Sequence, residues 1–249
     1  MMASEKYVRR LYNQFEVTFV PSVPLAGVLK EWGVRNVRQL GLGVNTESFQ
    51  PKPDDVAATR RSLAIEPERT LLLYIGRLAR EKNTATLFKG FELLVQRQPD
   101  RFQLLVIGDG PQGEQLRRLQ AQTGSVIWIQ YCTDSLELAR FYRAADLFVH
   151  PGRQETFGLV ALESQACGTP VVGIRGSNLD RIILHAQESW AAENTPAALA
   201  DAIEEFSGRD LKALGAAAAS LAAQRHAWPR VFERLFFIYR EVCANYTQH

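Results

Sequence analysis

From Thr70 onward, the sequence alternates short apolar runs rich in β-formers with longer amphipathic segments. This alternation is typical of parallel strands, because each parallel connection must carry the chain back along the sheet, usually as a helix. It predicts an α/β fold built on a doubly wound parallel sheet. The expected strands cover residues 71–75, 103–107, 126–129, 147–150 and 170–174, and the expected helices cover residues 84–96, 113–122, 135–144 and 157–166.

The carboxyl ends of these expected strands carry turn-forming and polar residues. They read Gly76-Arg77, Gly108-Asp109-Gly110, Gln130-Tyr131, His150-Pro151-Gly152 and Gly173. Doubly wound sheets bind their ligands at the carboxyl ends of the strands. We therefore expect the functional site at this edge.

The net charge, the apolar runs and the cysteines indicate which partners and which cellular location to expect. Lys and Arg number 29 against 27 Asp and Glu, a net charge of +2, which does not favour a nucleic-acid partner. No apolar run approaches the roughly 20 residues that span a bilayer, and the first 15 residues lack the apolar centre of a signal peptide. The three cysteines match no zinc or redox spacing and are expected to be buried, reduced thiols. We expect a cytoplasmic protein, with peripheral association at the inner face of the membrane left open.

Two glutamates fall within the segment 150–172, which reads HPGRQETFGLVALESQACGTPVV. Glu163 lies inside the expected helix, beside the packed face marked by Leu159, Leu162 and Ala166. An unpaired carboxylate in such a place loses hydration, and the hydroxyl groups of a ligand would compensate for that loss. A solvated or arginine-paired side chain is the alternative.

Glu155 comes just before the same expected helix. It lies near the amides of Phe157, Gly158 and Leu159, which together with the helix dipole favour an anion. The alternative is a carboxylate that only interacts with the dipole of the helix. For either glutamate taken alone, the structural explanation is preferred.

Two cations follow the first strong strand, in the sequence LYIGRLAREKN. Arg77 comes directly after Gly76, and Lys82 follows five residues later. The arginine fork matches phosphate oxygens and the lysine adds a mobile charge, so the two could hold a diphosphate and stabilise it as a leaving group. An exposed charged turn is the alternative, and it explains Lys82 better than Arg77.

The sequence GDGPQG at residues 108–113 matches the dinucleotide-binding pattern G-x-G-x-x-G, with Asp134 about 20 residues further on. It follows the second strong strand instead of the first, and Pro111 lacks an amide that could face a phosphate. A strand-to-helix turn with proline in the first helical turn explains it equally well. NAD binding is therefore a minor alternative.

No metal site is expected. No Asp-x-Asp pair stands at a strand end, and His185, His226 and His249 form no ligand spacing with carboxylates. His150 stands at a strand end, but a lone histidine is more often a structural hydrogen-bonding group. A metal-dependent transferase is disfavoured.

In combination, these motifs resemble glycosyltransferase family 4. The resemblance covers roughly residue 17 to the C-terminus and rests on Gly76-Arg77 with Lys82, the GDGP turn, and Glu155 and Glu163 followed by residues 167–172, CGTPVV. The stretch GVNTESFQP at residues 43–51 is similar to the interdomain linker of the family, and Trp228 with the segment after it resembles its final helix.

The resemblance implies a GT-B fold with a Rossmann-like donor domain, a nucleotide-diphosphate sugar as donor, no cofactor, no metal, and transfer with retention. The implied donor-binding residues are Gly76, Arg77, Lys82, Glu155, Thr156, Phe157, Gly158, Leu159 and Glu163. Arg77 and Lys82 would neutralise the diphosphate, and Glu163 would hold the ribose hydroxyls. Glu155 and the amides of residues 157–159 would contact the sugar and the distal phosphate, so Arg77, Lys82 and Glu155 are the implied catalytic residues.

The same resemblance predicts four parts. Residues 1–42 would be a remnant of the N-terminal domain, 43–55 the linker, 56–226 the donor domain, and 227–249 a helix that packs back on the N-terminal domain. A family member would carry more than about 100 further N-terminal residues. We therefore expect a truncated chain, or a partner chain that supplies the missing domain.

Three functions remain open at this point. The first is a hexosyltransferase acting on a lipid, a glycan or a small molecule. The second is a half-enzyme that binds nucleotide-sugar without activity of its own. The third is the NAD-linked oxidoreductase suggested by GDGPQG. The donor base, the sugar and the acceptor are not predicted.

Overall fold

The computed structural model describes residues 3–52, 55–153, 155–177, 179, 182–185 and 190–246. The chain divides into two compact units. Unit 1 comprises Met1–Gly43 and Gln224–His249, and unit 2 comprises Val44–Ala223. The four parts expected from the sequence stay a prediction, and residues 53 and 54 of the expected linker lie outside the described residues.

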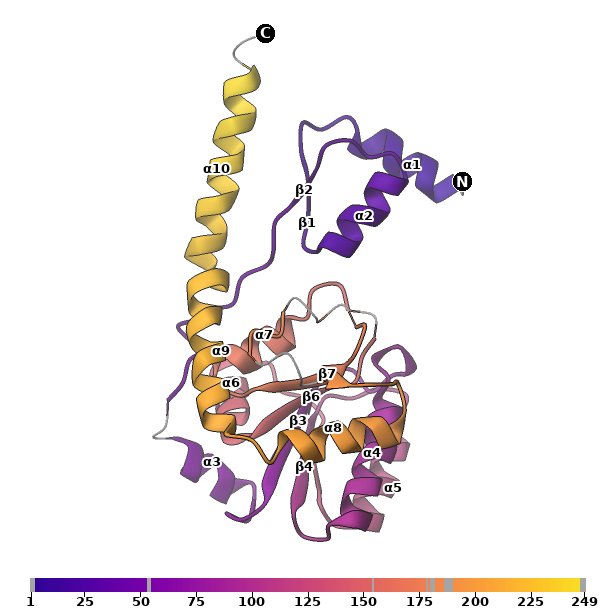
Figure 1. Cartoon of the computed structure of the whole chain (residues 1–249), viewed down its shortest axis with the longest axis vertical. Helices are drawn as coiled ribbons and strands as arrows, with labels where there is room; N and C mark the ends of the chain where they lie inside the picture. The colour runs from indigo at the N-terminus through magenta and orange to yellow at the C-terminus, as the bar shows by residue number, and fades with distance from the viewer. Residues whose placement is uncertain are drawn as a thin grey trace. The chain divides into compact units, whose positions relative to one another are not determined.

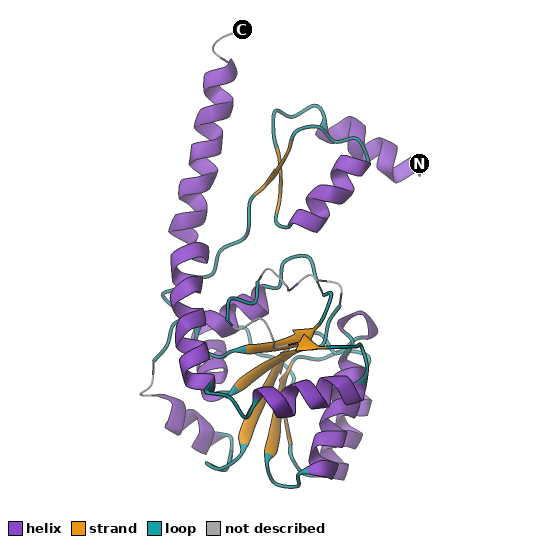
Figure 2. Cartoon of the chain, in the orientation of Figure 1, coloured by secondary structure: helices purple, strands orange, loops and turns teal. Residues whose placement is uncertain are grey.

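Unit 2 is built on one six-stranded sheet, coloured orange in Figure 2. Its strands, in the order β5-β4-β3-β6-β7-β8, pair in parallel throughout. The order reverses at the β3–β6 pair, so this pair is the topological switch point of a doubly wound sheet. The predicted fold class is confirmed. The strands are β3 (Thr70–Ile75), β4 (Phe102–Ile107), β5 (Val126–Ile129), β6 (Leu147–His150), β7 (Val171–Ile174) and β8 (Trp190–Ala191).

Helices cover both faces of this sheet (Figure 1). All six residues of β4 and all four of β6 are buried, as expected for strands with helices on either side. The helices α4 (Thr84–Arg97), α5 (Gly113–Thr123) and α8 (Pro196–Phe206) pack with the sheet in one apolar cluster. The helices α3 (Val56–Ser62), α6 (Ser135–Ala144) and α7 (Leu159–Ala166) contact one another and the sheet separately from that cluster.

The glycines of GDGPQG have a packing role. A Cβ on Gly108 would lie 2.1 Å from the carbonyl oxygen of Gly76, and one on Gly110 would lie 2.5 Å from that of Leu78. Their φ angles of +133° and +156° also favour glycine. The amide of Leu78 donates to the carbonyl of Asp109 at 2.9 Å. These glycines therefore let the loop after β4 pack closely on the loop after β3.

Unit 1 contains a small βαβ element. Its strands β1 (Thr18–Val20) and β2 (Val37–Gln39) pair in parallel, joined by α2 (Val23–Glu31). The helix α1 (Ala3–Tyr12) packs on their apolar cluster, and α10 (Trp228–Tyr246) also belongs to unit 1. The preceding helix, α9 (Leu211–His226), lies mostly in unit 2. On α10, four aromatic side chains remain exposed by 45–60%: Phe232, Phe236, Phe237 and Tyr239.

Several expected boundaries were wrong. The helix expected at residues 157–166 begins at Leu159, because Gly158 adopts a left-handed conformation with φ of +90° that ends the preceding loop. The short elements α1, α3 and β8 were not expected. Cys167 is buried, but Cys132 is partly buried and Cys243 exposed, so the expected burial holds for one thiol.

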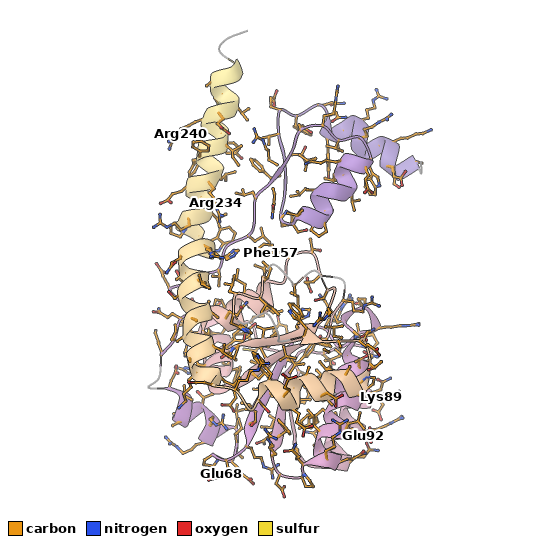
Figure 3. The ribbon with its side chains drawn as sticks, viewed as in Figure 1. Glu68, Lys89, Glu92, Phe157, Arg234 and Arg240 are labelled. Atoms are coloured by element: carbon orange, nitrogen blue, oxygen red, sulfur yellow. The ribbon has the colours of Figure 1, made fainter. Side chains whose placement is uncertain are left out.

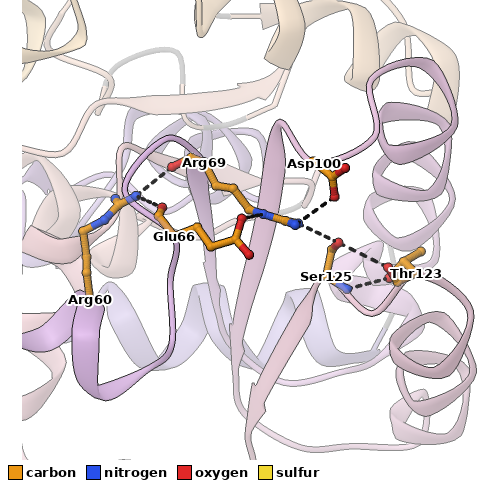
Figure 4. A network of polar contacts seen from close by, with 6 residues as sticks. All are labelled: Arg60, Glu66, Arg69, Asp100, Thr123 and Ser125. Atoms are coloured by element: carbon orange, nitrogen blue, oxygen red, sulfur yellow. Dashed lines mark hydrogen bonds and ion pairs between the residues drawn. The ribbon is translucent and has the colours of Figure 1, made fainter.

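A polar network joins the amino ends of the strands (Figure 4). Arg69, just before β3, contacts Glu66 at 2.8 Å, Asp100 at 2.9 Å and the hydroxyl of Ser125 at 3.1 Å. These contacts reach the segments that precede β4 and β5. Arg60 of α3 donates to the carbonyl of Arg69 at 2.7 Å, which adds the helix to the same network.

Arg60 also reaches the segment before β6. Its guanidinium donates to the carbonyl of Ala144 and to Asp146, both at 3.0 Å. The same Asp146 oxygen accepts the backbone amide of Leu71 in β3 at 2.7 Å. Arg60 and Asp146 therefore fix the start of β3 against the start of β6.

Replacement of Arg60 by alanine should lower the free energy of unfolding by about 2 to 3 kcal/mol. The side chain is only 14% exposed, and its loss leaves the carbonyls of Ala144 and Arg69 without their donor. Urea denaturation followed by circular dichroism would measure the change. Arg118→Ala is a matched control, because that side chain is 71% exposed and should cost less than about 0.5 kcal/mol. Equal effects of the two substitutions would contradict the prediction.

Candidate functional site

The loops that follow β3 and β6 are joined at the switch point. Lys82 ends the short 3₁₀ turn Arg80–Lys82, and its ammonium donates to Oε2 of Glu155 at 2.8 Å. The side-chain amide of Asn83 donates to the carbonyl of Pro151 at 2.9 Å. Lys82 and Glu155, two predicted site residues that are far apart in the sequence, are thus in contact at the switch point, where doubly wound sheets bind their ligands.

Glu155 also lies close to His150, the last residue of β6. The Nε2 atom of His150 is 3.5 Å from the same Oε2 atom, and the imidazole is almost fully buried. Hydrogen bonding from His150, and then from Lys82, lowers the pKa of Glu155 from 4.5 to about 2 against the opposing effect of burial. The site therefore holds a permanently ionised carboxylate at neutral pH.

Arg77 does not join this cluster. Its guanidinium contacts Glu81 four residues later, and the two side chains are 65% and 50% exposed. Gly76 before it has a φ of +154°, and a Cβ there would lie 2.9 Å from the hydroxyl of Tyr74. That hydroxyl donates to the carbonyl of Arg77 at 3.0 Å. The backbone of Arg77 is thus fixed while its charged end lies in solvent.

The residues between Glu155 and α7 differ in exposure. Thr156 is exposed, Phe157 is buried, and Leu159, the first residue of α7, is 40% exposed. A Cβ on Gly158 would lie 2.4 Å from the side chain of Leu179. In Figure 3, Phe157 lies at the opposite end of unit 2 from Glu68, which precedes β3. The segment therefore lies at the carboxyl edge of the sheet, and anion binding by its amides stays a prediction.

Glu163 lies in the second turn of α7 and is half-buried. Its Oε2 atom accepts a hydrogen bond from the hydroxyl of Tyr142 at 3.0 Å. Burial raises the pKa of Glu163 to about 7, and the hydrogen bond from Tyr142 partly opposes that rise. Within the described ranges, no arginine or lysine forms an ion pair with Glu163, so the arginine-paired alternative is not seen.

Sequence reasoning missed Tyr142 and underrated His150. Tyr142 lies 21 positions before Glu163 on a different helix, so no local spacing could reveal their contact. The position of His150 at the end of the strand expected at 147–150 was a usable signal, but its contact with Glu155 depends on how the following loop folds back.

The pattern that suggested NAD has structural explanations. Besides the packing of Gly108 and Gly110, Asp134 is the N-cap of α6, where its carboxylate accepts the amides of Leu136 at 2.8 Å and Glu137 at 3.3 Å. A ribose partner is not needed to account for Asp134.

The described residues also bear on metal binding and on membrane insertion. Among the described residues, no three His, Cys, Asp or Glu side chains are grouped so that they could hold a metal ion. In the same residues, none of the helices combines the length and apolar character needed to cross a membrane. The expectations of a site without metal and of a cytoplasmic location stay predictions.

The fold defines unit 2 as a doubly wound α/β domain. Residues 55–215 match the family described as "Glycosyl transferases group 1". Since that match covers more than half of the sequence, the chain belongs to this family.

Individual relatives agree with this assignment. The chain is 33% identical over 227 residues to a D-inositol 3-phosphate glycosyltransferase of Catenulispora acidiphila, covering 82% of this chain and 53% of that protein. It thus spans about half the length of the curated relatives it matches.

Solved structures share the fold. Sucrose-phosphate synthase from Thermosynechococcus elongatus superimposes with a TM-score of 0.79 at 25% identity, over 97% of this chain and 62% of that one. Anabaena HepE in complex with UDP and glucose gives a TM-score of 0.80 at 19% identity, over 95% and 66%. The predicted GT-B, Rossmann-like fold is confirmed.

Replacement of Glu155 by glutamine should destabilise the protein at neutral pH but hardly at all near pH 2. Because the pKa of Glu155 is lowered to about 2, its ionised form contributes stability above pH 4.5 that is lost as the pH falls towards 2. Urea denaturation of both proteins between pH 7 and pH 2.5 measures this difference. A difference that stays constant over the range would contradict the assigned ionisation.

Proposed function

We propose that this chain binds a nucleotide-diphosphate sugar at the switch point of unit 2, and that the protein transfers its hexose to an acceptor. The contact between Lys82 and Glu155 carries the proposal, since it places a cation and an ionised carboxylate together at the carboxyl edge where such sheets bind ligands. Membership of the family of group 1 glycosyl transferases supports it. The complexes of Anabaena HepE with UDP and with UDP-glucose support the class of donor.

Each group at the edge has a role in this proposal. Lys82 and Arg77 neutralise the diphosphate, with Gly76 giving the backbone room to turn. The exposed pair of Arg77 with Glu81 is weak, so a phosphate can replace Glu81 at little cost. Glu155, Thr156 and the amides of residues 157–159 contact the sugar and the distal phosphate, and Glu163 accepts hydrogen bonds from the ribose.

The proposed transfer retains the anomeric configuration, as in glycosyltransferase family 4. The bond between the anomeric carbon and the distal phosphate oxygen breaks through a transition state with oxocarbenium character. Negative charge grows on the departing diphosphate, and Arg77 and Lys82 stabilise it more strongly there than in the ground state. The acceptor hydroxyl forms its new bond to the anomeric carbon on the same face, and the departing phosphate oxygen takes up the proton of that hydroxyl. This proposal therefore needs no enzymatic nucleophile, metal or cofactor.

The second candidate function is that of a half-enzyme. It is supported by the finding that the chain spans only about half the length of its curated relatives. The chain would then bind the donor with the same residues but transfer no sugar by itself. The acceptor, whether lipid, glycan or small molecule, would contact residues other than those of the proposed donor site. Nucleotide titration tests the binding that both candidates share, and a turnover assay with added acceptor separates them.

One of UDP, GDP and ADP should bind the purified chain in the presence of EDTA, and the double variant Arg77→Ala, Lys82→Ala should bind it about 10- to 100-fold more weakly. Loss of one charged hydrogen bond to phosphate weakens the free energy of binding by up to about 3 kcal/mol, and water that hydrates the phosphate in its place reduces this loss. Isothermal titration calorimetry measures both constants.

The double variant Arg117→Ala, Arg118→Ala is the matched control, because it removes two positive charges on α5 outside the proposed site. It should retain wild-type affinity. Equal affinities for wild type and the Arg77, Lys82 variant, or a folded wild type that binds none of the three nucleotides, would overturn the assignment of the donor site.

A further inference from the structure

Tyr142 connects the core of unit 2 to the carboxyl group of Glu163. Its ring has no exposed surface and lies between Phe49, at a centroid distance of 5.9 Å, and Phe148, at 5.7 Å. Its backbone carbonyl accepts the hydroxyl of Thr169 at 2.6 Å. Both ends of the residue are therefore held by the fold, and its phenolic hydroxyl has a fixed position.

Among the described residues, that hydroxyl is the one side-chain donor that forms a hydrogen bond with the Glu163 carboxyl. It occupies Oε2 and leaves Oε1 for another donor. A phenol gives one hydrogen and carries no charge, so it orients the carboxyl without neutralising it. This differs from Glu155, whose carboxylate is held by the cation of Lys82.

We propose that Tyr142 is a positioning residue for nucleotide recognition, which holds Glu163 so that its second oxygen accepts the ribose hydroxyls of the donor. The ribose in this proposal comes from the proposed function, on which the proposal therefore rests. The contact between Tyr142 and Glu163 is observed in the structure and is independent of that function.

The hydrogen bond also acts on the proton of Glu163. A donor at Oε2 favours the ionised carboxyl, and this opposes the burial that raises the pKa of Glu163 to about 7. Besides Tyr142, the titratable group that faces Glu163 is Cys167, behind which Arg143 and Asp55 form an ion pair. An ionised carboxylate accepts hydroxyl hydrogens more strongly than a neutral acid, so Tyr142 improves both the orientation and the charge of the acceptor.

The substitution Tyr142→Phe removes the hydroxyl and keeps the buried ring. In the chain without nucleotide, it should raise the pKa of Glu163, observed by NMR of protein labelled with ¹³C at the glutamate carboxyl carbons. The variant Glu163→Gln identifies the resonance. Tyr7→Phe is the matched control, because that ring is 66% exposed on α1 and should leave the titration unchanged. An unchanged pKa in Tyr142→Phe would overturn the proposal whatever the nucleotides do.

The second measurement compares ribose with a sugar that lacks both hydroxyls. UDP, GDP and ADP are titrated against wild type, Tyr142→Phe, Glu163→Gln and the double variant, together with their 2′,3′-dideoxy counterparts. Tyr142→Phe should weaken the ribonucleotide that binds by about threefold to tenfold, in line with one hydrogen bond, and leave its dideoxy counterpart nearly unchanged. In the Glu163→Gln background, the same substitution should have little further effect.

The outcomes separate the positioning role from the proposed function. Equal weakening of the ribo and dideoxy nucleotides, or full additivity with Glu163→Gln, would overturn the positioning role while the donor site stands. If folded wild type binds none of the nucleotides, the proposed function and the ribose contact both fail. The carboxyl titration then still decides whether Tyr142 controls Glu163.

Discussion

The pairing of β3 with β6 is the constraint on which the candidate site depends. Leu72 and Leu73 of β3 lie opposite Leu147 and Phe148 of β6, so the two strands run side by side in parallel and their carboxyl ends leave the sheet at the same edge. The loops that begin there carry Lys82 and Glu155. A register slip of one residue would turn every side chain of β6 to the other face, and His150 would no longer point towards Glu155. The contacts of Arg60 and Asp146 at the amino ends oppose such a slip, so residues far from the site maintain its geometry.

The two glutamates of the site show how one βα unit creates two different acceptors. Glu155 lies beside Lys82 and His150, which keep it ionised well below neutral pH. Glu163, eight residues later, accepts a hydrogen bond from the neutral phenol of Tyr142, and burial raises its pKa to about 7. Environments that separate the pKa values of neighbouring carboxyls are a common way for a site to assign them different tasks. In the proposed complex both carboxyls would accept hydroxyl groups, the ionised Glu155 those of the sugar beside Lys82 and Glu163 those of the ribose.

The sequence could predict the strands because they form short apolar runs rich in β-formers, and β5 and β6 were predicted with their observed bounds. It could also predict that the polar strand ends share one edge, since parallel strands impose this. It could not predict which strands are neighbours, and so it could not place Lys82 against Glu155. The contact of Tyr142 with Glu163 joins two helices and depends on ring packing against Phe49 and Phe148. The start of α7 was misplaced because the left-handed conformation of Gly158 depends on the fold around Leu179.

Lys82 and Arg77 would not contribute equally to binding a diphosphate. The contact with Glu155 already restricts the long side chain of Lys82, so part of the ordering entropy is lost before a ligand arrives. Arg77 remains largely exposed and must be ordered when phosphate binds. Glu155 would also compete with phosphate for the ammonium of Lys82. The carboxylate carries one negative charge and a diphosphate carries more, so the diphosphate could share the ammonium with Glu155. In the proposed transfer both cations would stabilise the charge that develops as the leaving group departs, and the freer arginine would have the larger range of movement with which to follow it.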